Sequence, residues 1–200
     1  MGQYLEALIL ASLYIITTVF VYFHRVNDVE NAIVVRIYRA RRGGLLTSLS
    51  IALTKYGRLY FWGLLTLASF VVKAFGFAYP LAFAIALSYI LGGLTRVIIR
   101  RPRPHQLGLV DVPHRPEGYS YPSGHAAVAC AGAYVALFTL PLTVSIPLAL
   151  EALLVCFSRL YLNAHYPSDI VGGALLGFLS GSSALILFHL AVTLGIIQYP

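Results

Sequence analysis

Charged side chains are scarce in this 200-residue chain: only 10% of the residues are Asp, Glu, Lys or Arg, whereas 59% are hydrophobic. Soluble domains carry roughly 25% charged residues, so the chain lacks the polar surface that a water-facing globule needs. The mean hydropathy of +0.81 agrees with this shortage of charge. The composition therefore argues against a soluble helical domain and predicts an integral membrane protein.

Cysteine and acidic residues are also few. Cys130 and Cys156 both lie in apolar stretches, which excludes a disulfide framework or a Cys-x-x-Cys metal site. No cluster of Asp, Glu, His or Cys has the spacing of metal ligands, so neither a metal nor another cofactor is expected. The net charge of +7 comes from Arg residues that interrupt apolar segments. This pattern favours an anionic lipid or substrate as partner, and not nucleic acid.

The apolar residues that dominate the chain are gathered in long segments. A membrane-spanning helix needs about 20 mainly apolar residues. Six segments approach this length: Tyr4–Phe23, Gly57–Phe77, Leu81–Ile99, Ser123–Leu140, Thr143–Leu162 and Asp169–Ile197. Because there is no internal repeat or low-complexity tract, residues 1–200 are expected to form a single domain. The predicted fold class is all-α, a polytopic membrane protein with six transmembrane helices.

A more polar stretch separates the first two spans. Asp28 is the predicted N-cap of a helix whose apolar stripe consists of Val29, Ile33 and Ile37, and Gly43-Gly44 ends that helix. The opposite face carries Arg36, Arg39, Arg41 and Arg42. Such an amphipathic helix is expected to lie on the membrane surface. An aromatic belt is then expected where the second span enters the bilayer, formed by Tyr56, Tyr60, Phe61 and Trp62.

Alternation of the spans predicts which loops share a membrane face. The loop after the first span, the end of the third, the start of the fourth and the connection between the last two all fall on one side. All Lys and Arg residues except Lys73 lie on or near that side. Lys73 and Glu151, charges within apolar spans, are expected to pair with each other or to snorkel. Gly173, Gly177 and Gly181 form a small-residue face that predicts close helix packing within the chain.

Arginine is concentrated where the third span leaves the bilayer. Snorkelling to the interface accounts for Arg100 and Arg101. Arg96 lies about two turns deeper than Arg103, so a dedicated anionic partner is expected for it. Arg103 is followed directly by Pro104.

Two further segments carry reactive side chains to the same side. At the start of the fourth span, Ser123 could cap the helix and Gly124 would let an anion approach its free N–H groups, with His125 next in sequence. Before the sixth span, His165 and Asp169 are four residues apart, close enough for the carboxylate to fix the tautomer of the imidazole. Each segment alone has an ordinary explanation, as a capped helix start or a surface His–Asp contact.

Together the segments predict a phosphate site. The guanidinium groups of Arg96, Arg103 and Arg159 match phosphate oxygens, and charge neutralisation is the main need of phosphoryl transfer. Of the two histidines, one could attack phosphorus while the other protonates the leaving oxygen. A route without metal is therefore predicted.

This combination resembles the type 2 phosphatidic acid phosphatase (PAP2), or lipid phosphate phosphatase, family, which also includes vanadium haloperoxidases. The family pattern is Lys-x6-Arg-Pro, Pro-Ser-Gly-His and Ser-Arg-x5-His-x3-Asp. It matches Arg96-x6-Arg103-Pro104, Pro122-Ser123-Gly124-His125 and Ser158-Arg159-x5-His165-x3-Asp169. The resemblance extends over most of the chain. Arg96 replaces the usual Lys, which is expected to preserve phosphate binding with altered affinity or geometry.

The resemblance implies a mechanism through a phosphohistidine. His165 would be the nucleophile, oriented by Asp169, and His125 would protonate the leaving group. The phosphate would be held by Arg96, Arg103, Ser123, Gly124 and Arg159. The substrate would be a lipid phosphate that enters from the bilayer, and the protein would be a monomer or a weak homodimer.

Several alternatives stay open at this point. Phosphatidate, phosphatidylglycerol phosphate and polyprenyl (pyro)phosphates are all compatible substrates. The same site could transfer phosphate to a second lipid, or the arginines could belong to a non-enzymatic translocation path for anions or lipids. Orientation in the cell membrane is contested: the positive-inside rule favours a cytoplasmic site, whereas the family resemblance slightly favours the extracytoplasmic face.

Overall fold

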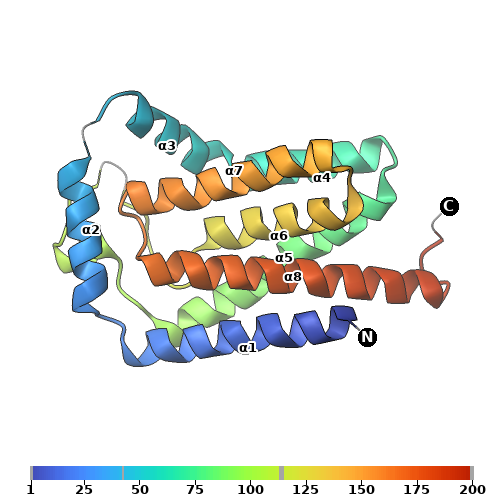
Figure 1. The fold of residues 1–200 in the computed structure, drawn as a ribbon, viewed down its shortest axis with the longest axis horizontal. Coiled ribbons are helices and arrows are strands. Elements are labelled where there is room, and N and C mark those ends of the chain that lie inside the picture. Colours follow the sequence, from blue (N-terminus) through green and yellow to red (C-terminus); the bar gives the residue numbers. More distant parts are fainter. Residues whose placement is uncertain (1, 42, 113–114, 199–200) are drawn as a thin grey trace.

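The computed structural model describes residues 2–41, 43–112 and 115–198, and the described chain is helical (Figure 1). The helices are α1 (Gly2–Phe23), α2 (Asp28–Ala40), α3 (Leu45–Tyr56), α4 (Leu59–Val71), α5 (Phe75–Ile99), the short 3-10 helix η1 (Pro104–Leu107), α6 (Gly124–Thr139), α7 (Leu142–Tyr161) and α8 (Pro167–Thr193). The predicted all-α class is confirmed.

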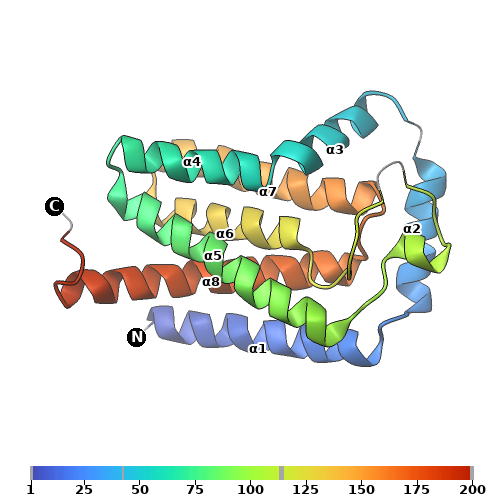
Figure 2. The ribbon, with the colours of Figure 1, turned by 180° about the vertical axis from the view of Figure 1, so that it is seen from behind.

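Helix α6 is the centre of a bundle whose long helices run along the longest axis of the molecule (Figures 1 and 2). It packs against α5, α7 and α8, and residues 126–136 are all buried. Many of these residues are Ala or Gly, which allow neighbouring backbones to come close. Four helices, α1, α5, α7 and α8, are long and apolar enough to cross a membrane, while the apolar helices α4 and α6 are shorter.

The region predicted as the second span has a different architecture. The chain forms α3 up to Tyr56, breaks at Gly57 and Arg58, and continues as the short helix α4. Gly57 is buried where a Cβ would press against Val155 and Glu151 of α7, so the break lies against that helix. The third span also begins earlier than Leu81, because α5 starts at Phe75 and runs through Pro80.

Helix α2 lies across one end of the bundle (Figure 1). Its N-cap is Asn27 and not Asp28: Oδ1 of Asn27 accepts the N–H of Val29 at 2.9 Å. The face that packs on the protein contains Glu30 and Val34, while the predicted apolar stripe stays exposed, with Val29 68% accessible. Helix α2 ends at Ala40, before the two glycines. Arg42 of the predicted basic face lies outside the described residues.

Trp62 is not part of an aromatic belt, in contrast to the exposed Tyr56 and Tyr60. Its indole is fully buried against Gly132 of α6, where a Cβ would collide with the ring. The indole N–H donates to Oε2 of Glu151 at 3.1 Å. The expected alternatives for Glu151, pairing with Lys73 or snorkelling, are therefore wrong: Oε2 accepts from the buried Trp62, and Oε1 is buried without a hydrogen-bond partner among the described residues.

The glycine face of α8 packs against α6, which confirms the expectation of close packing within the chain. A Cβ on Gly173 would approach the carbonyl oxygen of Ser123, one on Gly177 would collide with that of Ala127, and one on Gly181 would press on Tyr134. The close approach brings the start of α6 and the start of α8 together at the α2 end of the bundle.

Replacing Gly177 with Ala is expected to destabilise the protein by about 1–3 kcal/mol, because the new methyl group meets the backbone of α6. Gly93→Ala is the matched control, since a Cβ there would meet nothing within 4 Å and alanine favours the helix. Thermal unfolding in detergent measures both. An unfolding temperature of Gly177→Ala at or above that of the wild type would contradict the packing.

Candidate active site

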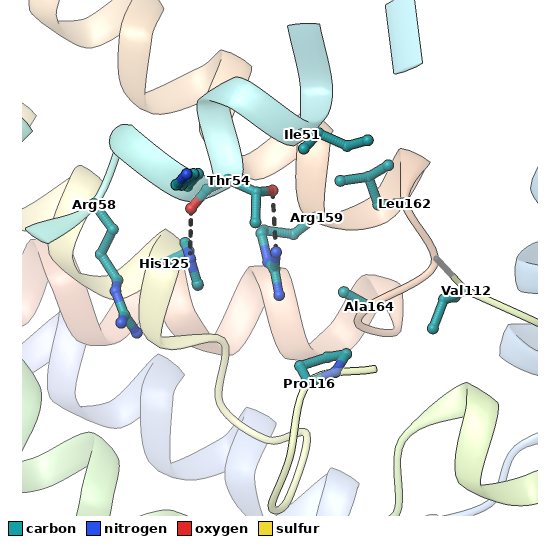
Figure 3. A pocket seen from close by; sticks show the side chains of 10 residues that line it. Ile51, Thr54, Arg58, Val112, Pro116, His125, Arg159, Leu162 and Ala164 are labelled. Atoms are coloured by element: carbon teal, nitrogen blue, oxygen red, sulfur yellow. Dashed lines mark hydrogen bonds between the residues drawn. The ribbon is translucent and has the colours of Figure 1, made fainter. Parts of the chain in front are cut away.

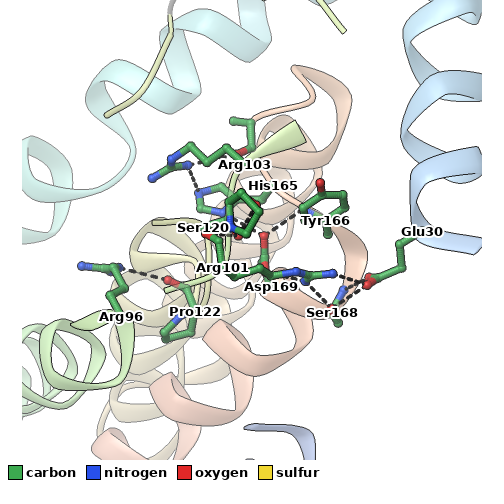
Figure 4. Close-up of polar contacts among 12 residues, drawn as sticks. Glu30, Arg96, Arg101, Arg103, Ser120, Pro122, His165, Tyr166, Ser168 and Asp169 are labelled. Atoms are coloured by element: carbon green, nitrogen blue, oxygen red, sulfur yellow. Dashed lines mark hydrogen bonds and ion pairs between the residues drawn. The ribbon is translucent and has the colours of Figure 1, made fainter. Parts of the chain in front are cut away.

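Three segments meet at the α2 end of the bundle: the chain that follows α5, the start of α6 and the connection between α7 and α8 (Figure 4). Helix α5 stops because Arg100 adopts a left-handed conformation with φ of 51°. The chain then passes through Arg101 and Arg103 before Pro104 begins η1. Both of these arginine side chains turn into the protein and are buried.

The connection between α7 and α8 is fixed by a helix cap. Asn163 has a left-handed φ of 55° and donates from its side chain to the carbonyl of Val34 in α2 at 2.9 Å. Tyr166 is the N-cap of α8, and its N–H donates to Oδ2 of Asp169 at 2.9 Å. Carboxylates stabilise the first turn of a helix. The cap therefore places His165 directly before α8, beside the carboxylate of Asp169.

His165 lies between this carboxylate and a guanidinium group. Its Nδ1 is 3.4 Å from Oδ2 of Asp169, and its Nε2 is 3.2 Å from NH1 of Arg103. Because a guanidinium can only donate, Nε2 carries the lone pair. Burial lowers the pKa of His165 well below its ordinary value, and the positive charges of Arg103 and Arg159 lower it further. The imidazole is therefore neutral near pH 7, with Nε2 available as a nucleophile.

Arg103 is held by backbone carbonyls. Its Nε donates to the carbonyl of Gly118 at 3.0 Å, and NH1 donates to that of Ala164 at 2.9 Å. Burial and the nearby charge of Arg96 lower the pKa of Arg103 to about 10, against the opposing effect of Asp169. The group remains protonated at neutral pH and is only partly neutralised by the protein.

The start of α6 adjoins this pair. The N–H of Ser123 donates to the carbonyl of Asp169 at 2.9 Å, which joins two of the sequence motifs directly. Ser123 is the N-cap residue, but its hydroxyl makes no capping bond, so that part of the prediction is wrong. The buried Oγ has no hydrogen-bond partner among the described residues. Arg96 donates from Nε to the carbonyl of Pro122 at 3.2 Å and lies against Gly124.

Arg159 and His125 line a cavity of about 700 Å³ next to these residues (Figure 3). NH1 of Arg159 donates to Oγ1 of Thr54 at 3.0 Å, and Nε2 of His125 is 3.0 Å from the carbonyl of Thr54, to which it can only donate. Both contacts come from α3, the helix that sequence analysis did not predict. Ala164 lines the same cavity, whereas the neighbouring His165 is only 2% exposed.

The predicted site residues therefore lie together at one end of the bundle. His165, Asp169 and Arg103 are in direct contact, and Ser123 is tied to Asp169 through the backbone. Arg159 and His125 occupy the cavity on the α3 side. Within the described part of the chain, no group of three His, Cys, Asp or Glu side chains is arranged to hold a metal ion.

Arg101 does not take the position at the membrane interface that the sequence predicted. It does not snorkel: it is fully buried, and its NH1 donates to Oδ1 of Asp169 at 2.7 Å while NH2 pairs with Glu30 of α2 (Figure 4). Its guanidinium also lies 4.0 Å above the ring of Tyr166. Burial alone would lower the pKa of Arg101, but the two carboxylates outweigh burial and raise it.

The sequence did contain a signal for this network. Only seven residues of the chain are acidic, so each carboxylate near the arginine-rich side was a candidate partner for a buried guanidinium. Glu30 and Val34, four residues apart and so on one face of α2, are both buried against the protein.

Comparison with known proteins assigns the chain to a family. Residues 77–193 match the model of the PAP2 superfamily. The chain belongs to this superfamily. An undecaprenyl-diphosphatase of Sulfolobus acidocaldarius is 35% identical over 139 residues, and the match covers 66% of this chain and 66% of that protein, slightly less than two thirds of its length.

Two solved structures are also similar. The crystal structure of LpxE from Aquifex aeolicus has a TM-score of 0.69 to this chain, with 29% sequence identity, and the match covers 75% of this chain and 90% of that chain. A transmembrane PAP2-type phosphatidylglycerolphosphate phosphatase from Bacillus subtilis is 22% identical and has a TM-score of 0.71 over 97% of this chain and 98% of that chain. The second likeness concerns the fold alone. Together with the apolar helices, these findings indicate a membrane protein.

Replacing Arg101 with Met is expected to destabilise the protein by about 3–5 kcal/mol, because Asp169 and Glu30 would keep buried charges without their cation. Arg100→Met is the matched control, since the neighbouring Arg100 is exposed and bonds only to the carbonyl of Val97 in its own helix. Thermal unfolding in detergent reports the difference. Equal unfolding temperatures for the two variants would refute the structural role of Arg101.

Proposed function

We propose that this protein is a membrane phosphatase that hydrolyses a lipid phosphate through a phosphohistidine on His165. The observation that carries the proposal is the neutral imidazole of His165, set between the carboxylate of Asp169 and the guanidinium of Arg103. Asp169 faces Nδ1 and so favours the tautomer in which Nε2 carries the lone pair, and Arg103 must release this nitrogen before it attacks. The names of the relatives support a phosphate-cleaving activity.

In the first step, Nε2 of His165 attacks phosphorus, and the bond between phosphorus and the leaving oxygen breaks. The leaving oxygen takes a proton from Nδ1 of His125 in its imidazolium form, while Nε2–H bonds to the carbonyl of Thr54. Arg96, Arg103 and Arg159 neutralise the equatorial oxygens, and the free hydroxyl of Ser123 and the N–H of Gly124 complete the phosphate site.

In the second step, water attacks the phosphohistidine. His125 accepts a proton from that water, the phosphorus–nitrogen bond breaks, and inorganic phosphate leaves while His165 recovers its lone pair. Each histidine thus returns to its starting protonation state. No step of this reaction uses a metal ion or another cofactor.

The lipid tail accounts for the location of the site at the end of an apolar bundle. The substrate class that the relatives favour is a polyprenyl diphosphate, because the relative from Sulfolobus acidocaldarius is an undecaprenyl-diphosphatase. The exposed apolar side chains of α3, among them Leu49 and Ile51, would contact lipid beside the cavity. We further propose that α4 and α6 also cross the membrane, which gives six spans.

Replacing His165 with Ala is expected to abolish release of inorganic phosphate, with a loss of at least about 10⁴-fold, because nucleophilic catalysis has no substitute in the site. The measurement uses purified protein with a lipid diphosphate labelled with ³²P on its terminal phosphate. Acid quenching should trap an acid-labile, alkali-stable phosphoenzyme, and more of it in His125→Ala, where hydrolysis is slowed.

His189→Ala is the control, since that residue lies in α8 outside the site. Transport of the lipid that survives in His165→Ala, with no release of inorganic phosphate by the wild type, would instead favour a non-enzymatic translocation path. Label that passes to an added lipid alcohol, and not to inorganic phosphate, would favour the phosphotransferase alternative.

The site is proposed to face outward from the cell membrane. In a background with Cys130→Ala and Cys156→Ala, a cysteine in place of the exposed Glu117 should react with an impermeant maleimide on whole cells. One in place of Lys73, in the turn between α4 and α5, should react only after permeabilisation. The reverse pattern would place the site in the cytoplasm.

A further inference from the structure

Two basic side chains that the proposed mechanism does not use face the cavity from the end of α3 and the break that follows it. Lys55 and Arg58 line its wall together with His125 and Arg159 (Figure 3). The guanidinium of Arg58 lies 5.7 Å from the ring of Tyr89. Among the residues that the structure describes, no carboxylate pairs with either group or lines the cavity.

Arg58 also approaches the start of α6. A Cβ on Gly124 would lie 3.8 Å from its NH1 and would collide with the guanidinium of Arg96, so two guanidinium groups converge on the same glycine. Like charges that gather without a counter-ion make a strong anion site.

The order of these groups separates two anion positions. Arg103 and Arg159 accompany His165, where the reacting phosphorus would lie. His125, the proton donor to the leaving group, marks the other side of that phosphorus. Arg58 lies on the other side of His125 from Arg159 (Figure 3). A group bound at Arg58 would therefore belong to the leaving group.

The leaving group of a diphosphate differs from that of a monoester in charge. When a lipid diphosphate is cleaved, the bond from the terminal phosphorus to the bridging oxygen breaks, and this oxygen, which takes the proton from His125, stays on the lipid as part of an anionic monophosphate. A monoester leaves a neutral alcohol instead. Only the first has an anion that a guanidinium can stabilise as its charge develops.

We propose that Arg58, assisted by Lys55, binds the phosphate that remains on the lipid and so makes this site selective for lipid diphosphates. This inference rests on the proposed phosphatase function and assigns its preference for a diphosphate to particular side chains. The break between α3 and α4 positions Arg58 for this contact, because it brings Arg58 to the start of α6.

The test compares two substrates with the same tail, a polyprenyl diphosphate and the corresponding monophosphate. Arg58→Ala should lower kcat/KM for the diphosphate by about ten-fold or more, the usual effect of losing a charged hydrogen bond, and for the monophosphate by no more than about two-fold. Arg58→Lys should keep part of the preference. Lys73→Ala, which removes a cation at the opposite end of the bundle, should change neither value.

Inhibition provides a second readout. Methylenediphosphonate, which has no hydrolysable bridge, should inhibit Arg58→Ala about ten-fold more weakly than the wild type, whereas inhibition by inorganic phosphate should change by less than about two-fold. Thermal unfolding of Arg58→Ala, expected to match that of the wild type, separates these effects from misfolding.

Equal losses on both substrates, or no loss on the diphosphate, would overturn the assignment of Arg58. A wild-type protein that cleaves only the monophosphate would overturn it as well, while leaving the proposed phosphatase function intact. Turnover that persists in His165→Ala would instead remove the proposed function itself.

Discussion

The guanidinium of Arg101 is the contact on which the arrangement of this site depends. It bonds to Asp169 at the start of α8 and to Glu30 of the surface helix α2, and stacks on Tyr166 between them. A fully buried cation is tolerated because two carboxylates offset its desolvation. Asp169 in turn faces His165 and accepts the N–H of Tyr166, the N-cap residue of α8. One buried cation thus connects α2, the end of α5 and the histidine.

The arginines around the site have fewer acidic partners than Arg101 has. The guanidinium of Arg101 donates to two carboxylates and a carbonyl, whereas Arg96 donates to a carbonyl, Arg159 to a hydroxyl, and Arg103 to carbonyls and the imidazole of His165. Protein carbonyls carry only partial charge, so the cluster retains net positive potential in a poorly solvated place. That potential keeps His165 neutral and favours a dianionic ligand, and close packing of α8 on α6 holds the groups in place.

The differences between expectation and structure have one physical origin. Trp62 is of a residue type that is common at membrane interfaces, but Gly132, which is distant along the chain, leaves room for its ring inside the bundle. The helix α3 is short and partly polar, so it resembled a loop, and only its packing on α7 brings Thr54 to His125 and Arg159. Arg100 and Arg101 are equivalent in sequence, yet one is exposed and the other fully buried. In each case the partner lies far away along the chain.

The sequence by itself determined the membrane class, the helical fold, the family and the residues that gather around His165. These follow from local quantities: hydrophobic length, charge spacing, and side-chain types that only certain chemistry uses together. Tertiary structure alone decided that Arg101 pairs with Glu30 and that Arg58 reaches the cavity beside His125. These contacts depend on which distant segments of the backbone come close enough to bury a charged side chain. Burial makes an unpaired charge costly, so a buried charged side chain needs a specific partner.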